Sequence, residues 1–469
     1  MNYQEFLNQK QTIIEPTGFE VDDQYINEKL FPFQRAIVKW ALRRGRSAIF
    51  ADTGLGKSFM QIEWAWQVSQ YTGNRVLILA PLCVAEQTVK EADKLGYYVR
   101  YERSFGKDKH GKPRDEGSGS IIITNYEMLH EFEDAIRSGY FDGIVLDESS
   151  IIKHKDSKTR NFIIETAKHI PYKLSATATP SPNDYMEMGN QAEFLGVMTM
   201  AEMLAMYFIH DSGETSKWRL KGHGEAKFWE WLATWAATIK KPSDLGFSDD
   251  GYDLPGLEIE EIVVDSAHSI SDNTTLSGRN EARRISIDER VQAAVNIINN
   301  DSDQYVVWCN LNDESQKLKD GINGSVEVKG SDKIEHKESR IQSFTEGESR
   351  VMVTKPSIAG FGMNWQHCNK MVFVGLNDSF EQLYQAIRRC YRFGQTKVVK
   401  VYLISSVLEG AVRDNILEKE RKAEAMSKAM IDHMANFTKR EIVSLTTEKT
   451  DYNPQAEMNI PSFLGASNA

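Results

Sequence analysis

The strongest constraint on the fold is a glycine-rich loop that lies between a strand-like run and a helical run. Ser47–Phe50 is short and apolar, as expected of a buried strand, and apolar residues recur with helical spacing from Phe59 to Gln70. The loop between them reads Ala51-Asp52-Thr53-Gly54-Leu55-Gly56-Lys57-Ser58. Glycines let backbone N–H groups approach phosphate oxygens at the amino terminus of a helix. The pattern therefore predicts an α/β sheet that binds a phosphorylated ligand where this strand ends.

The polar side chains of this loop indicate ATP with Mg²⁺ as the ligand. Lys57 can reach the β- and γ-phosphates, and the Ser58 hydroxyl can ligate the metal. An accidental Gly-Lys-Ser beside a strand is the alternative, and it leaves the flanking periodicity unexplained. We expect the nucleotide-binding loop to comprise Asp52, Thr53, Gly54, Leu55, Gly56, Lys57 and Ser58.

Strand-like runs alternate with amphipathic stretches in two series, which indicates two α/β lobes with mostly parallel sheets covered by helices. After the first strand, the runs are Val76–Ala80, Ile121–Thr124 and Gly143–Leu146, and then Tyr305–Cys309, Val351–Thr354, Met371–Val374 and Lys400–Ile404, with a helix expected at Glu335–Phe344. We assign residues 1–250 to an N-terminal lobe, 251–262 to a linker, 263–440 to a C-terminal lobe and 441–469 to a poorly ordered tail.

An aromatic-rich segment at about 200–248 belongs to the first lobe in this assignment. Phe228, Trp231, Leu232 and Trp235 recur at i, i+3, i+4 and i+7, which predicts one stripe of a helix. We expect this stripe to pack onto the first lobe. Stacking of nucleic-acid bases on the rings is the alternative.

Composition excludes several classes of protein. A net charge of −11 over 469 residues rules out a histone-like basic tail, so any nucleic-acid contact must be local. The four cysteines form no C-x-x-C pair, and His210, His223 and His367 lack metal-ligand spacing, so neither zinc nor disulfides are expected. The longest apolar run, Val76–Ala85, is about half a membrane span, and no signal pattern opens the chain. We expect a cytoplasmic protein with no membrane contact.

Two further motifs suit phosphoryl transfer. Asp147 and Glu148 follow a strand 90 residues after Lys57, where α/β sheets place ligands, so Asp147 would hold the metal and Glu148 would orient the attacking water. Arg389 and Arg392 lie three apart on an expected helix that Gly394 would end. They would stabilise charge on the γ-phosphate when the lobes close. Exposed charge is the alternative for each motif alone.

The ordered motifs resemble the SWI/SNF-like ATPase branch of the superfamily-two helicases and translocases, from about Leu30 to Lys422. The resemblance implies two tandem RecA-like lobes with the ATP cleft between them. Its segments are Leu30-Phe31-Pro32-Phe33-Gln34, the loop Ala51–Ser58, Ala80-Pro81-Leu82, Thr124-Asn125-Tyr126-Glu127, Ile152–Lys158, Leu174–Pro180, Val328–Ser331 with Ile341–Phe344, Ala359–Trp365 and Gln385–Gln395.

Site residues follow from the resemblance. It implies that Gln34 reads the adenine, that Gly362 also binds ATP, and that Thr177 and Thr179 couple hydrolysis to movement. Nucleic-acid contacts are implied at Pro81, Thr124, Asn125, Tyr126, Lys153 and Ser357, and we add Lys155, Lys158 and Arg160 as candidate cations, with solvated charge as the alternative.

The sequence departs from the family pattern at several positions, and these departures indicate which kind of family member it is. Asp147-Glu148-Ser149-Ser150 replaces the usual D-E-A-H or D-E-G-H, so the histidine that links ATP to the coupling motif is missing. Asn377-Asp378-Ser379 stands where W-N-P is frequent, and the length leaves no room for histone-reading domains. We interpret the chain as a compact bacterial or bacteriophage version, acting in the bacterial host cell.

The expected function is an ATP- and Mg²⁺-dependent DNA translocase in which lobe closure drives movement along the DNA backbone. Duplex DNA is favoured over single-stranded DNA, with RNA and a protein partner left open, and binding should depend strongly on salt. The alternatives are a strand-separating helicase and a nucleotide-switched binding module with incidental turnover. A metabolic P-loop kinase leaves the second lobe unexplained.

Overall fold

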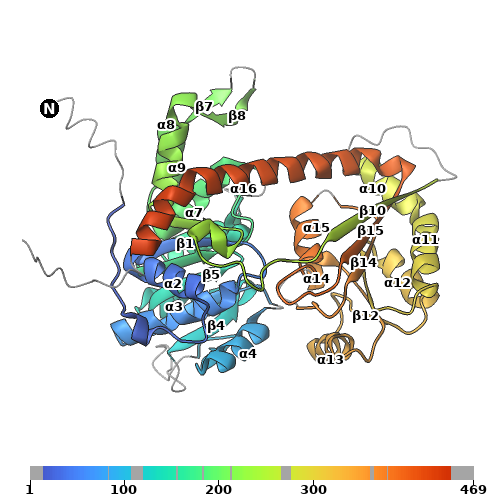
Figure 1. Cartoon of the computed structure of the whole chain (residues 1–469), viewed down its shortest axis with the longest axis horizontal. Coiled ribbons are helices and arrows are strands. Elements are labelled where there is room, and N and C mark those ends of the chain that lie inside the picture. Colours follow the sequence, from blue (N-terminus) through green and yellow to red (C-terminus); the bar gives the residue numbers. More distant parts are fainter. Residues whose placement is uncertain are drawn as a thin grey trace, which may run out of the picture.

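Two parallel sheets form two lobes that lie side by side (Figure 1). The computed structural model describes residues 14–82, 84–106, 120–154, 157–181, 184–211, 214–265, 276–359, 364–377 and 379–444. In these ranges the first sheet has the order β3-β4-β2-β5-β6-β1-β9 and the second the order β10-β15-β14-β11-β13-β12. Every pairing within them is parallel, and helices cover the sheets. The predicted fold of two α/β lobes is confirmed.

The sheet of lobe 1 consists of strands buried on both faces, which is why they read as continuous apolar runs. The four predicted runs are the cores of β1, β2, β4 and β5. Three further strands, β3, β6 and β9, are short and were not predicted. The strands are β1 (Arg46–Ala51), β2 (Arg75–Ala80), β3 (Val99–Tyr101), β4 (Ile121–Asn125), β5 (Phe141–Asp147), β6 (Tyr172–Ala176) and β9 (Ala236–Ile239).

Helices of lobe 1 cover both faces of this sheet, and each face has its own apolar core cluster. The α-helices are α2 (Pro32–Arg44), α3 (Lys57–Thr72), α4 (Ala85–Leu95), α5 (Glu133–Arg137), α6 (Lys158–Thr166), α7 (Met188–Leu195), α8 (Met200–Tyr207) and α9 (Glu225–Ala233). Short 3₁₀ turns are η1 (Asp23–Tyr25), η2 (Tyr126–Phe132), η3 (Ser149–Ile152), η4 (Tyr185–Glu187), η5 (Gly222–Gly224) and η6 (Pro242–Leu245).

The aromatic segment of lobe 1 is part of its core. Phe228, Trp231, Leu232 and Trp235 are at most 3% exposed, and Trp235 lies just beyond the end of α9. Packing onto lobe 1 is therefore confirmed, and base stacking on these buried rings is excluded. Next to α9 in Figure 1, an antiparallel hairpin of β7 (Phe208–Asp211) and β8 (Glu214–Leu220) projects from the lobe.

Lobe 2 contains the second sheet, and its four predicted strands are confirmed. The helix predicted at Glu335–Phe344 is α13. The strands are β10 (Leu257–Val264), β11 (Tyr305–Cys309), β12 (Ser325–Glu327), β13 (Val351–Thr354), β14 (Lys370–Val374) and β15 (Val399–Ser406). The helices are α10 (Leu276–Ile285), α11 (Ile287–Asn299), α12 (Asn312–Gly321), α13 (Ile334–Thr345), α14 (Pro356–Ala359) and α15 (Phe380–Ile387), with the 3₁₀ turn η7 (Val407–Glu409).

The connection between the lobes is shorter than the predicted linker at 251–262. Strand β10 begins at Leu257 and pairs with β15 over its whole length. Its glutamates made it resemble an exposed linker, because an edge strand with exposed side chains carries no continuous apolar run.

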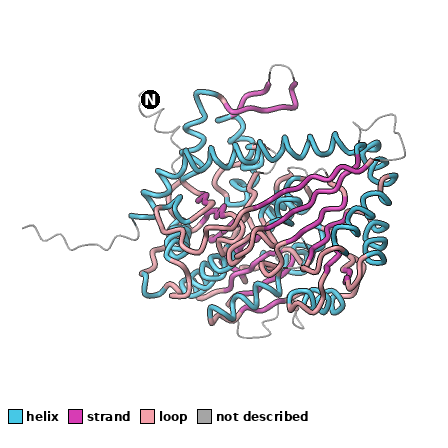
Figure 2. Tube along the Cα trace, turned by 45° about the vertical axis from the view of Figure 1, so that its right-hand side comes forward, coloured by secondary structure: helices cyan, strands magenta, loops and turns pink. Residues whose placement is uncertain are grey.

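The last described helix, α16 (Gly410–Ser444), leaves lobe 2 and crosses to lobe 1, as Figures 1 and 2 show. Met426, Met430 and Met434 are buried in one core cluster of lobe 1, and Ile442 is buried in the other. The boundary predicted at residue 440 therefore falls inside a helix, and the predicted tail begins within it. Residues 445–469 lie outside the described part. No helix in the described ranges is both long and apolar enough to span a bilayer.

Candidate functional site

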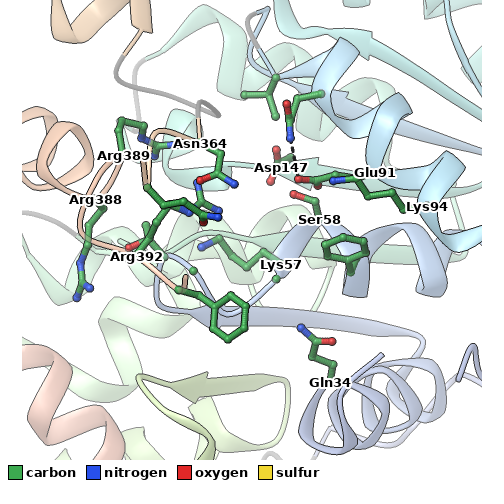
Figure 3. Close-up of a pocket in the computed structure, with 18 of the residues that line it drawn as sticks. Gln34, Lys57, Ser58, Glu91, Lys94, Asp147, Asn364, Arg388, Arg389 and Arg392 are labelled. Carbon is green, nitrogen blue, oxygen red and sulfur yellow. Dashed lines mark hydrogen bonds between the residues drawn. The ribbon is translucent and has the colours of Figure 1, made fainter. Parts of the chain in front are cut away.

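A cavity of about 280 Å³ lies between the two lobes and collects side chains from both (Figure 3). Loop residues, the acidic pair and two segments of lobe 2 meet there, although they are far apart in the sequence. Lobe 1 contributes Gln34, Thr53, Gly54, Gly56, Lys57, Ser58, Asp147 and Glu148, and lobe 2 contributes Asn364, Gln366, Arg388, Arg389, Arg392 and Phe393. The cleft predicted between the lobes is present.

The glycine-rich loop joins β1 to α3, and two of its glycines have backbone conformations that other residues rarely adopt. Gly54 has φ 90° and Gly56 has φ 76°. A Cβ atom on Gly56 would lie 2.3 Å from Nε2 of Gln34, and one on Gly54 would lie 3.2 Å from the backbone N of Phe393 in lobe 2. The loop is thus close to both lobes, and the N–H groups at the start of α3 are available for phosphate.

Lys57, the first residue of α3, is half-buried next to this loop. Its Nζ donates to the carbonyl oxygens of Ala51 (2.9 Å) and Asp52 (3.3 Å). Burial lowers the pKa of Lys57, while the carboxylates of Glu148, Asp52 and Asp147 oppose that shift. A phosphate in the cavity would supply the nearby negative charge that favours the protonated amine.

Asp147 ends β5 and accepts a hydrogen bond from Nε2 of Gln61 at 2.7 Å. Burial, assisted by the charge of Glu148, raises the pKa of Asp147 to about 7, against the opposing effects of Gln61 and Lys57. The Ser58 hydroxyl lines the same cavity. Oxygen donors of this kind fit Mg²⁺, which would compensate the charge that burial disfavours.

Glu148 has an unusual backbone conformation. Its φ is 51°, and among the described residues it alone has a positive φ without being glycine. Strained backbone of this kind persists where surrounding contacts hold it. The Glu148 carboxylate accepts a hydrogen bond from Oγ1 of Thr177 at 3.3 Å, and Thr177 Oγ1 accepts the Thr179 N–H at 3.1 Å. Glu148 therefore contacts Thr177 directly, one of the two residues predicted to couple hydrolysis to movement.

The segment Ser149-Ser150, which follows the acidic pair, is held inside lobe 1. Ser149 and Ser150 are both buried, and the Ser149 carbonyl accepts a hydrogen bond from Gln191 of α7 at 3.0 Å. Nδ2 of Asn190, also in α7, donates to the carbonyl oxygen of Lys153 at 2.7 Å. These bonds fix the chain that leaves the acidic pair.

The predicted arginine helix is wrong in its extent. Helix α15 ends at Ile387, and Arg389 and Arg392 lie in the turns that follow. The carbonyl of Arg389 accepts the N–H of Trp365 at 2.9 Å, a bond to a buried tryptophan that a continuing helix would not make. Both arginines nevertheless line the cavity. Burial and the neighbouring charge of Arg389 lower the pKa of Arg392 to about 10, so it stays charged near neutral pH.

Charge in the cavity favours an anionic ligand. Among the described residues that line it, six side chains are basic and three are acidic, in a protein with a net charge of −11. The basic residues are Lys29, Lys57, Lys94, Arg388, Arg389 and Arg392, and the acidic ones are Glu91, Asp147 and Glu148. Sequence reasoning missed Arg388, although it adjoins a predicted site residue.

An aromatic cluster at the cavity was also missed. Phe31 of lobe 1, Tyr252 of the connection and Phe393 of lobe 2 all line it, and their ring centroids lie 4.8–6.0 Å apart. Gln34, close by, accepts the Phe31 N–H at 2.9 Å and donates to the Leu55 carbonyl at 2.9 Å. The three rings come from segments that are far apart in the chain, so no helical or strand periodicity in the sequence could predict that they meet.

Two predicted nucleotide-loop residues lie outside the lining of this cavity. Leu55 is buried in the core of lobe 1. Asp52 lines a second cavity of about 90 Å³, and its carboxylate bonds to lobe 2 through Tyr384 and Arg388. Gly362 lies outside the described residues.

Three of the predicted nucleic-acid contacts have buried side chains. Thr124, Asn125 and Tyr126 are at most 6% exposed. Asn125 accepts the N–H of Met128 at 3.1 Å as the cap of η2, and the Tyr126 hydroxyl donates to the Asp147 carbonyl at 2.6 Å. These side chains are committed inside lobe 1, so the geometry does not support direct phosphate contact by them.

Some of the cations predicted to contact nucleic acid are also engaged within the protein, and others have accessible side chains. Arg160 is 7% exposed, donates to Asn190 at 3.1 Å and pairs with Glu193, so the geometry does not support contact between its side chain and DNA. Lys153 is paired with Glu381 of lobe 2. The predictions with accessible side chains are Lys158 and Ser357, which are exposed, and Pro81, which is half-buried. Lys155 lies outside the described residues.

Comparison with known proteins matches both lobes. Residues 33–208 match the family described as SNF2-related domain, and residues 289–394 match the helicase conserved C-terminal domain. A SWI/SNF-related matrix-associated actin-dependent regulator of chromatin subfamily A-like protein 1 from Drosophila melanogaster is 21% identical over 452 residues, covering 86% of this chain and 56% of the relative.

Two shorter matches each cover about a third of this chain. A DNA excision repair protein ERCC-6-like from Danio rerio is 28% identical over 178 residues, which is 34% of this chain and 12% of the relative. Putative protein p41 of Acyrthosiphon pisum secondary endosymbiont phage 1 is 28% identical over 177 residues, 35% of this chain and 38% of the relative. The chain thus spans between 12% and 56% of the lengths of these three relatives.

Taken with two parallel-sheet lobes and a cavity that joins the phosphate loop to the arginines of the second lobe, these matches show that the chain belongs to the SWI/SNF-like branch of the superfamily-two helicases and translocases.

Proposed function

We propose that the protein is an ATP-dependent DNA translocase that cleaves ATP in the cavity between its lobes. One observation carries the proposal: the phosphate loop and the acidic pair of lobe 1 line the same cavity as Arg389 and Arg392 of lobe 2. A hydrolytic site divided between two bodies couples cleavage to their relative motion.

Each side chain has a role that its position supports. Lys57 and the N–H groups at the start of α3 bind the β- and γ-phosphates, and Ser58 with Asp147 would hold Mg²⁺, which neutralises charge on the phosphates. Glu148 orients the attacking water. Arg389 and Arg392 stabilise the charge of the transition state.

A chain of hydrogen bonds supports coupling between this site and lobe 2. Glu148 accepts from Thr177, which accepts the Thr179 N–H, and the Thr179 hydroxyl donates to Glu381 of α15 at 3.1 Å. Glu381 is also paired with Lys153, a candidate DNA contact. A change at the γ-phosphate can therefore be transmitted to the lobe interface through a few bonded side chains.

We propose duplex DNA as the polymer and the cytoplasm of a bacterial cell as the place of action. The relatives include a DNA excision repair protein, which supports DNA as the polymer, and a phage protein, which supports action inside a bacterial cell. Backbone contacts by Lys153, Lys158 and Ser357 would make binding independent of sequence and sensitive to salt.

The test is the steady-state ATPase rate with Mg²⁺, alone and with duplex DNA, single-stranded DNA or RNA, at low and moderate salt. Lys57→Ala and Glu148→Gln should be inactive controls, and Glu148→Gln should still bind ATP. Stimulation by duplex DNA, with displacement of a third strand from a triplex, supports the translocase. Unwinding of a forked duplex would instead indicate a helicase, and a single turnover without stimulation would indicate a nucleotide switch.

A further inference from the structure

Helix α15 of lobe 2 contacts lobe 1 through three side chains spaced for one helical face, Glu381, Tyr384 and Arg388, the last being its C-cap. Glu381 bonds to Thr179 and Lys153. At the other end of the helix, Tyr384 and Arg388 both bond to Asp52 of the phosphate loop.

The contact with Asp52 is short and half-buried. The Tyr384 hydroxyl donates to Oδ1 at 2.5 Å, and a guanidinium nitrogen of Arg388 donates to Oδ2 at 2.8 Å and to the Tyr384 oxygen at 3.1 Å. The Arg388 and Asp52 side chains are only 16% and 11% exposed. Burial opposes the charge of Arg388, but Asp52, Tyr384 and Tyr391 together raise the pKa of Arg388.

The same carboxylate also holds the phosphate loop. Oδ1 of Asp52 accepts the backbone N–H of Thr53 at 2.7 Å. Asp52 lies outside the lining of the nucleotide cavity, and Figure 3 shows the Arg388 side chain directed away from Lys57. Arg388 itself lines the nucleotide cavity, so the pair joins the loop to lobe 2 at the edge of that cavity.

Arg388 directly precedes Arg389, the first of the two predicted arginines of the cavity. Helix α15 ends at Ile387, so Arg389 and Arg392 are held by turn hydrogen bonds instead of a continuous helix. Arg389 has two bonds of its own, from its Nε to the Gln385 carbonyl at 3.0 Å and from the Trp365 N–H to its carbonyl at 2.9 Å, but both stay within lobe 2. The bond from Arg388 adds the contact with the phosphate loop of lobe 1.

We propose that Arg388, together with Tyr384, is a positioning residue for ATP hydrolysis, and that its bond to Asp52 fixes the end of α15 on the phosphate loop so that Arg389 and Arg392 enter the cavity in register with the γ-phosphate. The inference rests on the proposed function and specifies how the two lobes are aligned at the nucleotide cavity.

The test uses the full chain and compares Arg388→Ala, Asp52→Asn and the double variant. Asparagine keeps an oxygen that can accept the Thr53 N–H but loses the charge that pairs with Arg388. Each single variant should lower kcat by about tenfold or more, with KM for ATP and affinity for ADP changed less than about threefold. The double variant should be no slower than the slower single variant, because both remove one interaction.

Two further variants separate positioning from other roles. Arg388→Lys should recover part of kcat, since it keeps the charge that pairs with Asp52 but lacks the planar guanidinium group whose one nitrogen bonds to both Asp52 and Tyr384. Arg421→Ala is the matched control, because the Arg421 side chain is 76% exposed and lines neither cavity. It should behave like the unmodified protein, and thermal unfolding should show all variants folded.

Distinct outcomes would overturn the inference. A slow Arg388→Ala with a normal Asp52→Asn would mean that Arg388 acts on the nucleotide directly. Loss of ADP affinity or of the folded state in both variants would mean a structural role. An unmodified protein without turnover would overturn the proposed function and this inference with it, whereas normal turnover in every variant would overturn the inference alone.

Discussion

Thr177→Val tests the direct bond between the acidic pair and the coupling motif. Valine has nearly the same shape as threonine, so the buried packing at 177 stays while the hydroxyl is lost. Two bonds disappear: the donation to Glu148 at 3.3 Å and the acceptance of the Thr179 N–H at 3.1 Å. A bond to a carboxylate contributes about 1.5–3 kcal/mol at good geometry, and we take about 1 kcal/mol for this long one and about 1 kcal/mol for the backbone bond.

The total of about 2 kcal/mol corresponds to a fall in DNA-stimulated kcat of about 30-fold, while ADP affinity and the rate without DNA should change little. Steady-state ATPase assays with and without duplex DNA measure both rates. Thr345→Val is the control, because its exposed hydroxyl donates to the Ile341 carbonyl one turn earlier in α13, at 2.8 Å. Equal stimulation of Thr177→Val and the unmodified protein would refute this route of coupling.

Three more outcomes can be checked. Tyr252→Ala should raise KM for ATP by about tenfold with kcat retained, as expected if the adenine stacks at the aromatic cluster, and Tyr98→Ala, with a ring 60% exposed, should have no effect. Glu381→Gln should raise affinity for labelled duplex DNA a few-fold at low salt, because it releases Lys153 from its carboxylate partner, and weaker binding in fluorescence anisotropy would contradict this competition. Burial, with a smaller effect of Arg46, lowers the pKa of Lys173 to about 7, so between about pH 7 and pH 10 the unfolded chain binds a proton that the folded chain has released, and stability should rise with pH. Lys173→Met should flatten that rise in urea unfolding at pH 7 and 9.5, and an unchanged slope would show that Lys173 does not cause it.

Local patterns were sufficient to predict much of the site. Strand, loop and helix around Lys57 follow from periodicity and glycine placement, and Asp147 could be placed near them because the carboxyl ends of parallel strands meet at one edge of a sheet. Arg389 and Arg392 were predicted in the cleft from their motif alone, and they line the cavity.

What sequence could not reveal depends on contacts between distant segments. The end of α15 at Ile387 reflects a bond from Trp365, which no helical period contains. The pairing of Lys153 with Glu381 joins residues 228 positions apart, and it changes an expected free cation into part of the lobe interface. Strand β10 was hidden because pairing with β15, and not burial of its own side chains, makes it a strand.

Asp52 shows why membership of a motif does not fix a side chain's role. A phosphate loop binds its ligand mainly through backbone N–H groups, so several of its side chains are free to take other partners. At Asp52 the carboxylate bonds to Tyr384 and Arg388 of lobe 2 and leaves the nucleotide cavity. Backbone and side chain of one residue can therefore serve phosphate binding and lobe alignment separately. That separation is why Asp52→Asn can slow hydrolysis without weakening the binding of nucleotide.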